Sequence, residues 1–214
     1  EDLLLTVQSA LQSYKHQKSL TLQDSYQTAI NRVLQLILEP LPFEEQLSEA
    51  LSTTLSTPCF SDEIKGSIFL ESLTQNETER SKLIMISHIN NETGPGTFTK
   101  DLSENSKHIE LIHTQTETTA SQVPLYYRAP IILRERIVGF LYLYVTPKHR
   151  ETPQTKTFIC SVCHILAGMV RLAQYNKALE QHNAKLEVQV EKRTHELDEA
   201  LQKQAKQNNL LLET

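Results

Sequence analysis

The chain has 214 residues, of which 39% are hydrophobic, and a formal net charge of −5 at pH 7. This length suffices for one globular domain together with extended helices. The acidic balance argues against a nucleic-acid partner, which needs a basic surface, and no apolar run approaches the roughly 18 residues of a membrane span, so we expect neither partner.

Two helices are predicted at the start of the chain. Apolar residues recur at spacings of three and four over 1–38, as they do on one face of a helix. Pro40 and Pro42 end this helix, because proline lacks a backbone donor and keeps the residue before it out of helical geometry. The same spacing predicts a second helix over 43–55.

From residue 64 the pattern changes to short runs rich in β-branched and aromatic residues, which predict strands. Arg134 and Glu135 are expected to join two strands into an antiparallel hairpin, and Pro130 indicates a bulge or an edge position in the first of them. The stretch 90–107 shows little pattern and is the longest expected loop. The predicted strands cover 64–70, 82–89, 108–113, 125–133 and 136–145.

A further helix is predicted from Pro153 onward. Thr152 can cap this helix with its hydroxyl, and proline is favoured at the first helical position. Only Gly168 interrupts the pattern, so we expect the helix to continue unbroken into the last part of the chain. Its apolar stripe consists of Phe158, Val162, Ile165, Met169 and Leu172.

Residues 172–214 have the pattern of a parallel coiled coil, with apolar residues at steps of three and four. Asn183 and Arg193 fall at core positions, and the regular alternation of steps fails after Arg193. Such a discontinuity locally unwinds the supercoil, so we expect two registers of similar energy; a plain dimerisation tail is the alternative. The seam contains Leu172, Leu179, Leu186, Val190, Leu197, Leu201, Ala205, Asn208 and Leu212.

Three segments resemble the GAF sensor domain. LILEPLPFEEQLSEAL at 36–51 is similar to the GAF opening, and KGSIFL at 65–70 is similar to its first strands. RIVGFLYLYVTPKHRETPQTKTFICSVCHILAGMV at 136–170 is similar to the last strand and the closing helix. The resemblance covers about 33–172. It implies an α+β fold, in which helices flank an antiparallel sheet.

Two further segments resemble parts of bacterial signalling proteins. EKRTHEL at 191–197 resembles the Arg-Thr-x-Glu-Leu signature of signalling helices, and 2–14 resembles the last helix of a receiver domain. These resemblances imply a cytoplasmic fragment with a linker helix at 1–32, a sensor domain at 33–172 and a coil at 173–214. A histidine kinase or diguanylate cyclase output is expected beyond the fragment, which is itself not expected to be an enzyme.

The strand at 125–133 lines a ligand pocket in GAF relatives. Tyr126 and Arg128 share one face of this strand by alternation, and an aromatic ring beside a guanidinium suits an anionic or planar ligand. Phe98 and His113 are candidates to close the pocket. These four residues are the predicted small-molecule site; the competing interpretation is a core tyrosine with an arginine at the strand edge.

We expect a homodimer, because an apolar coil seam is stable only against a partner helix. The helices before and after the sensor domain are expected to form a bundle between the two copies. The predicted contacts are Ile30, Val33, Ile37, Val162 and Met169 in this bundle, and Leu179, Leu186, Val190 and Leu197 in the coil.

Cys160, Cys163 and His164 spell C-x-x-C-H, a string that can attach c-type haem. Cys163 and His164 also resemble the bilin-attachment pair of some phytochrome-type GAF domains, and some GAF-fold proteins reduce free methionine sulfoxide with cysteines. These alternatives stay open beside the simpler one of buried thiols on a core helix. Three cysteines, an odd number, suit a reducing compartment. We expect no cofactor, no metal and no catalytic residue.

Overall fold

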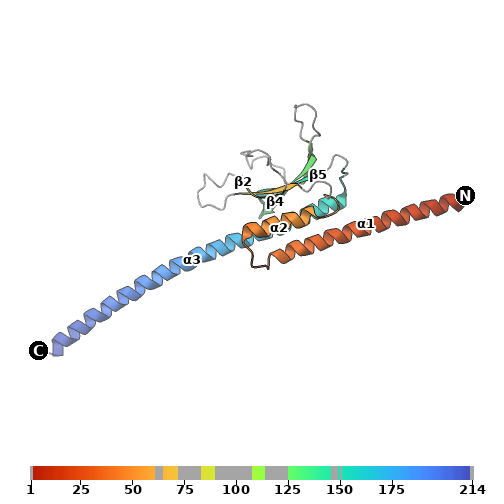
Figure 1. Ribbon diagram of the computed structural model, residues 1–214. Helices are drawn as coiled ribbons and strands as arrows, with labels where there is room; N and C mark the ends of the chain where they lie inside the picture. Colours follow the sequence, from red (N-terminus) through yellow and green to blue (C-terminus); the bar gives the residue numbers. More distant parts are fainter. Residues whose placement is uncertain are drawn as a thin grey trace. The chain divides into compact units, whose positions relative to one another are not determined.

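The computed structural model describes residues 2–60, 65–71, 83–89, 108–113, 125–145, 149 and 151–212. The chain divides into two compact units, Glu1–Arg171 and Leu172–Thr214. The elements follow in the order α1 (Asp2–Leu36), α2 (Phe43–Leu55), β1 (Gly66–Glu71), β2 (Leu83–Ile89), β3 (Glu110–His113), β4 (Leu125–Leu133), β5 (Arg136–Val145) and α3 (Pro153–Leu212) (Figure 1). The predicted α+β class is therefore confirmed.

Within the described residues, five strands form one sheet in the order β2-β1-β5-β4-β3, and every neighbouring pair is antiparallel. β4 and β5 form the predicted hairpin through Arg134 and Glu135, whose φ angles are 50° and 66°. Positive φ at both turn positions is the type I′ geometry, which matches the twist of paired strands. The register shifts between Ile131 and Ile132, so the irregularity lies one residue after Pro130.

Helices cover one face of the sheet, called here the near face (Figure 1). Leu47, Leu51 and Leu55 are spaced by four residues and place three buried leucines on one side of α2. Burying each of these side chains contributes about 2 kcal/mol to stability. The core that they join also contains Val33, Leu36, Ile68, Tyr127, Leu141, Leu143, Phe158, Val162 and Leu166.

The core reaches further towards the N-terminus than the predicted domain boundary at residue 33. Tyr26 and Ala29 of α1 are buried in it. In contrast, Leu5, Leu11 and Tyr14 in the first half of α1 are more than half exposed, at 64%, 52% and 66%. The second half of α1 is thus part of the domain, and its first half presents apolar side chains to solvent.

The start of α3 is capped as predicted. The hydroxyl of Thr152 accepts a hydrogen bond from the backbone N–H of Thr155 at 3.1 Å, and Pro153 is the first helical residue. A stretch of this helix is long and apolar enough to cross a membrane by length and composition alone, and 44% of that stretch is buried inside the structure. Phe158 and Val162 pack in the core, so packing accounts for much of this hydropathy.

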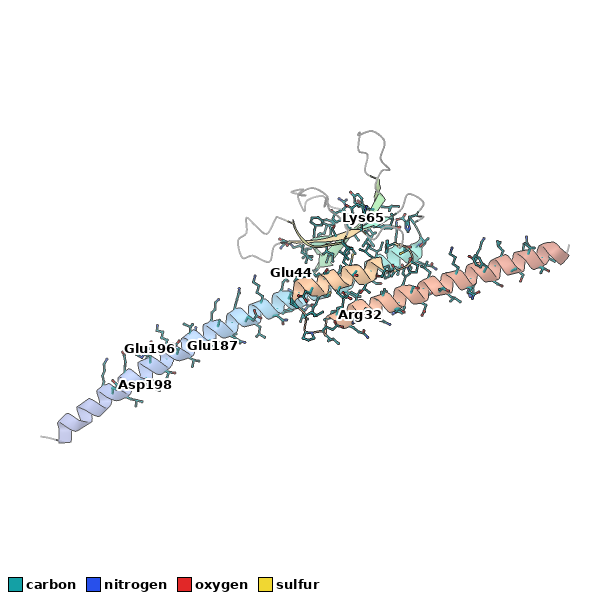
Figure 2. The ribbon with its side chains drawn as sticks, viewed as in Figure 1. Arg32, Glu44, Lys65, Glu187, Glu196 and Asp198 are labelled. Atoms are coloured by element: carbon teal, nitrogen blue, oxygen red, sulfur yellow. The ribbon has the colours of Figure 1, made fainter. Side chains whose placement is uncertain are left out.

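The described part of the second unit, 172–212, is the remainder of α3. Apart from the half-buried Ala173, its side chains are exposed from Leu172 to Lys203. Figure 2 shows the side chains of Glu187, Glu196 and Asp198 projecting outward from the helix. A helix of this length without tertiary packing needs another source of stability, because isolated helices are marginal in water.

Candidate functional site

The second face of the sheet, called here the far face, carries aromatic side chains. Tyr127, Ala129 and Ile131 of β4 point into the core on the near face. Tyr126 belongs instead to a separate cluster, as the alternation of side chains along a strand requires. Tyr126 and Arg128 were predicted to share one face of the strand, and both lie on the far face. There Arg128 lies against Phe140, a member of the same cluster.

Five aromatic residues, called here the far-face cluster, lie on three neighbouring strands: Phe69, Tyr126, Phe140, Tyr142 and Tyr144. The rings of Phe69 and Tyr142 meet edge to face, with centroids 5.4 Å apart. Tyr126 lies 5.7 Å from Tyr142 and 5.6 Å from Tyr144. These spacings are typical of attractive aromatic pairs. The strand register puts Tyr126 directly opposite Tyr144, so the cluster follows from the pairing of β4 with β5.

Arg128 brings a positive charge to this aromatic surface. Its guanidinium lies over the ring of Phe140, 5.7 Å from the centroid, and its Nη2 is 2.6 Å from Oε2 of Glu110. Glu110 faces Arg128 directly in the register of β3 and β4. Because the carboxylate offsets the charge, the site combines a compensated cation with tilted aromatic rings, of which Phe140 is buried and Tyr126 is half-buried. That chemistry suits a planar aromatic ligand better than a simple anion.

The phenol of Tyr126 is neutral at physiological pH. Burial raises the pKa of Tyr126 above its ordinary value, and the neighbouring Tyr144 raises it further, whereas Arg128 opposes the change. A neutral phenol both donates and accepts hydrogen bonds. Tyr126 can therefore bind a polar edge of a ligand whose ring stacks on the cluster.

The side chains that the structure describes include two of the four predicted ligand residues, Tyr126 and Arg128. His113 is the last residue of β3 and is paired with Leu125 in the register, which places it on the strand next to Tyr126. Phe98 lies outside the described residues. The candidate ligand site therefore rests on Tyr126 and Arg128, with Glu110 and Phe140 as partners that the sequence interpretation missed. Alternation along β3 could not have indicated Glu110, because it does not fix the register of β3 against β4.

A polar network lies on the near face, between the sheet and the start of α3. Oη of Tyr127 is 2.8 Å from Nε2 of His149, and Oη of Tyr26 is 3.1 Å from Oγ1 of Thr155. The ring of Tyr26 stacks on Phe158 with centroids 4.4 Å apart. Burial raises the pKa values of both tyrosines above their ordinary range. The sequence interpretation did not identify this network, although a tyrosine facing a core needs a polar partner.

The three cysteines lie in different environments. Cys163 is buried in the core, Cys59 is half-buried and Cys160 is exposed. Burial raises the pKa of the Cys163 and Cys59 thiols, which disfavours the thiolate that a nucleophile needs. Attaching haem through both Cys160 and Cys163 would require drawing Cys163 out of the core. Cys163 therefore fits a core thiol better than a haem, a bilin or a reductase thiol, whereas Cys160 is exposed and not a buried thiol as the simpler interpretation expected.

The predicted dimer contacts fall into two groups. Val33, Val162 and Met169 are buried in the core of the chain itself, and Ile30 and Ile37 pack half-buried against it. Leu179, Leu186, Val190 and Leu197 are 59%, 44%, 63% and 61% exposed. The coil residues are thus available to a partner helix, whereas the packing of the first group is already satisfied inside the domain. Dimerisation itself stays a prediction.

No protein-family model matches the sequence, and no curated protein matches it. Solved structures do match. A GAF domain assigned to a sensor histidine kinase from Pseudomonas syringae pv. tomato has a TM-score of 0.59 at 12% identity, over 79% of this chain and 99% of that one. The GAF domain of the Coxiella burnetii phosphoenolpyruvate-protein phosphotransferase ptsP has a TM-score of 0.55 at 11% identity, over 73% and 98% of the two chains.

The GAF domain of an Acinetobacter phosphoenolpyruvate-protein phosphotransferase gives a TM-score of 0.51 at 13% identity, over 69% of this chain and 93% of that one. At such identities the likeness establishes the fold. The GAF fold implied by the sequence resemblance is therefore confirmed.

Proposed function

We propose that this chain of GAF fold is the sensory and transmission part of a bacterial signalling protein, acting as a cytoplasmic parallel homodimer. In this proposal the chain is not an enzyme. A signal passes from the domain through a coiled coil to a C-terminal output domain, either a histidine kinase or a diguanylate cyclase. The observation that carries the proposal is α3, which supplies core residues to the domain and also the exposed seam.

The exposed seam supports a partner helix. Leu179, Leu186, Val190 and Leu197 are each at least 44% exposed, although they recur at heptad spacing. Charge pairs along the helix are too weak to stabilise it alone: Lys192 and Glu196 are 3.8 Å apart and both are more than half exposed, and such pairs contribute about 0.3–0.5 kcal/mol. Burial of the leucines against a second copy offers a larger gain.

The ligand in this proposal is a small planar aromatic molecule bound at the far-face cluster. The support is the stacking of Arg128 on Phe140 beside Tyr126, with the guanidinium charge offset by Glu110. A packing role alone is the competing interpretation, because Phe69, Phe140 and Tyr142 are only 5% exposed. A ligand would have to displace some of the contacts that bury them.

Tyrosine fluorescence tests ligand binding directly, because the chain contains seven tyrosines and no tryptophan to mask their emission. A panel of planar heteroaromatic compounds should include binders that quench this emission in the wild type. Replacing Tyr126→Leu should weaken their binding about tenfold, the loss of one stacking contact of 1–1.5 kcal/mol. Replacing the exposed Tyr175→Leu should not. Equal affinities in both variants would contradict a far-face site.

Transmission through the coil can be tested with chimeras. The catalytic part of a histidine kinase is joined after Thr214, and one to seven residues are inserted at the junction. A coiled-coil transmitter predicts kinase activity that varies with the insert and recovers at seven residues, the heptad repeat. Activity that is independent of the insert length would mean that the coil only tethers the output domain.

A further inference from the structure

Tyr127 has a fully buried side chain whose hydroxyl needs a partner inside the protein. It lies on β4 between Tyr126 and Arg128, the two far-face residues, but points to the near face. Its Oη is 2.8 Å from Nε2 of His149, and the two rings meet edge to face with centroids 5.5 Å apart. Because a buried hydroxyl without a partner is costly, this hydrogen bond ties His149 to the middle of β4.

His149 lies just before the start of α3. Thr152, three residues later, caps the helix by accepting the N–H of Thr155. The hydroxyl of Thr155 in turn is within hydrogen-bond distance of Tyr26 of α1. The chain itself, over three residues, therefore joins the contact of His149 with the strand that carries Tyr126 to the capped first turn of α3.

We propose that the Tyr127–His149 hydrogen bond is a proton-sensitive latch that holds the start of α3 against strand β4. With His149 neutral and its proton on Nδ1, Nε2 accepts a hydrogen bond from the Tyr127 hydroxyl. A proton taken up from solvent by Nε2 turns that nitrogen into a donor. The bond then reverses, with Nε2–H donating to Oη of Tyr127. The Tyr127 O–H is left without its acceptor in a buried site, and a charged ring is buried beside β4, so the contact between β4 and His149 becomes less stable.

The groups around His149 determine the direction of this effect. Tyr127 faces it from β4, and Glu151 lies beside it in the segment before α3; the Cys59 thiol, from the segment after α2, lies near Tyr127. Burial lowers the pKa of His149 from its ordinary value, and Glu151 opposes this shift. The folded protein thus prefers neutral His149. The stabilisation is complete above the ordinary histidine pKa of about 6.5 and is lost as the pH falls through the lowered value.

The first test is a nitrogen-15 and carbon-13 NMR titration of the histidine side chains in the whole 214-residue chain. The latch predicts that neutral His149 carries its proton on Nδ1. It also predicts that His149 titrates below the ordinary histidine pKa of about 6.5. A proton on Nε2 in the neutral ring, or titration of His149 at or above that ordinary value, would contradict the proposal.

The second test is amide hydrogen exchange in the first turns of α3, corrected for the intrinsic pH dependence of exchange. Protection in the wild type should fall when the pH is lowered from 7.5 to 5.5. The variant His149→Gln keeps an acceptor that does not titrate, so it should keep its protection at both pH values. The exposed residue on the same helix, His164→Gln, is the matched control and should behave as the wild type.

The third measurement removes the donor. Tyr127→Phe should lower protection of the first turns of α3 by roughly fivefold at pH 7.5, the effect of one ordinary hydrogen bond. It should reduce the dependence on pH without abolishing it, because burial of His149 still disfavours its charged form. If His149→Gln retains the full pH response of the wild type, the latch is wrong. The signalling role of the latch rests on the proposed function. The hydrogen bond and its response to pH do not, so these measurements can confirm or contradict the latch even if the chain is not a sensor.

Discussion

Arg128 of β4 and Glu110 of β3 stand directly opposite each other in the sheet, and their side chains form an ion pair with Nη2 and Oε2 2.6 Å apart. The same guanidinium stacks over Phe140 of β5. Arg128 thus joins three strands beside the far-face cluster. This relationship makes the charge of Arg128 a property of the pair, and in the proposed function it sets the ligand preference of the site.

Removal of the Glu110 carboxylate should change ligand preference more than stability. Glu110→Gln should lower the free energy of unfolding by at most about 1 kcal/mol, because the Glu110 side chain is 42% exposed and such pairs are weak. Affinity for planar anionic compounds should rise relative to neutral ones of the same shape, measured by tyrosine fluorescence. Glu71→Gln, which removes the ion pair with Arg136, is the control. Equal shifts in both variants would contradict a specific role for Glu110.

Replacing Gly139 and Gly168 with alanine should have opposite effects on the free energy of unfolding. A Cβ on Gly139 would meet the backbone oxygen of Phe69 and approach Cδ2 of Leu70 to 2.6 Å. Gly139→Ala should therefore destabilise the domain by about 1–3 kcal/mol, as overpacking does. Gly168 is exposed on α3 with nothing within 4 Å of a new Cβ, so Gly168→Ala should stabilise by about 1 kcal/mol. Urea unfolding compares the two; a stabilising Gly139→Ala would refute the close packing of β1 on β5.

A substitution in the hairpin turn should stabilise the domain. Glu135 has φ of 66° and carries a side chain in a conformation that favours glycine or asparagine. Glu135→Gly should raise the free energy of unfolding by roughly 0.5–1 kcal/mol, seen as a higher midpoint in thermal unfolding. Glu135→Ala is the matched control and should give no gain, because alanine keeps the Cβ. Equal gains from both would point to the loss of the charge instead.

Much of this fold could be predicted from apolar periodicity. The bounds of α2, β4 and β5 agree with the predicted ranges, because Pro42 and the turn at Arg134 and Glu135 interrupt the pattern sharply. The alternation in β4 also separates Tyr126 from Tyr127 correctly. These features depend on the spacing of residues along the chain, so they can be predicted from the sequence alone.

Contacts between distant segments could not be predicted in the same way. The hydrogen bond of Tyr127 with His149 spans 22 residues and depends on where β5 returns the chain. The stripe of Val162 and Met169 indicated burial, but periodicity does not say against what, and the structure places both in the core of the domain. The partner of Arg128 likewise depends on the register of β3, which the polar stretch before it does not determine.

Arg193 should limit the stability of the coil. It occupies a predicted core position, and its flexible stem packs less well than leucine. Arg193→Leu should raise the free energy of unfolding of a dimer by about 1–2 kcal/mol per chain and, in a kinase chimera, reduce the response to ligand. Lys192→Leu changes an adjacent residue outside the seam, whose side chain is 77% exposed, and should do neither. Similar effects of both variants would mean that an added apolar side chain changes stability wherever it lies on the helix, and that the core position of Arg193 is not the cause.

The central claim is that the exposed seam of α3 binds a second copy of the chain. Sedimentation equilibrium between about 1 and 100 µM tests it, since dimers dissociate on dilution. We predict twice the 24.5 kDa chain mass for the wild type and for Val188→Lys, which lies off the seam, but a single chain mass for Leu186→Lys. A wild type that sediments at 24.5 kDa throughout this range would contradict the account.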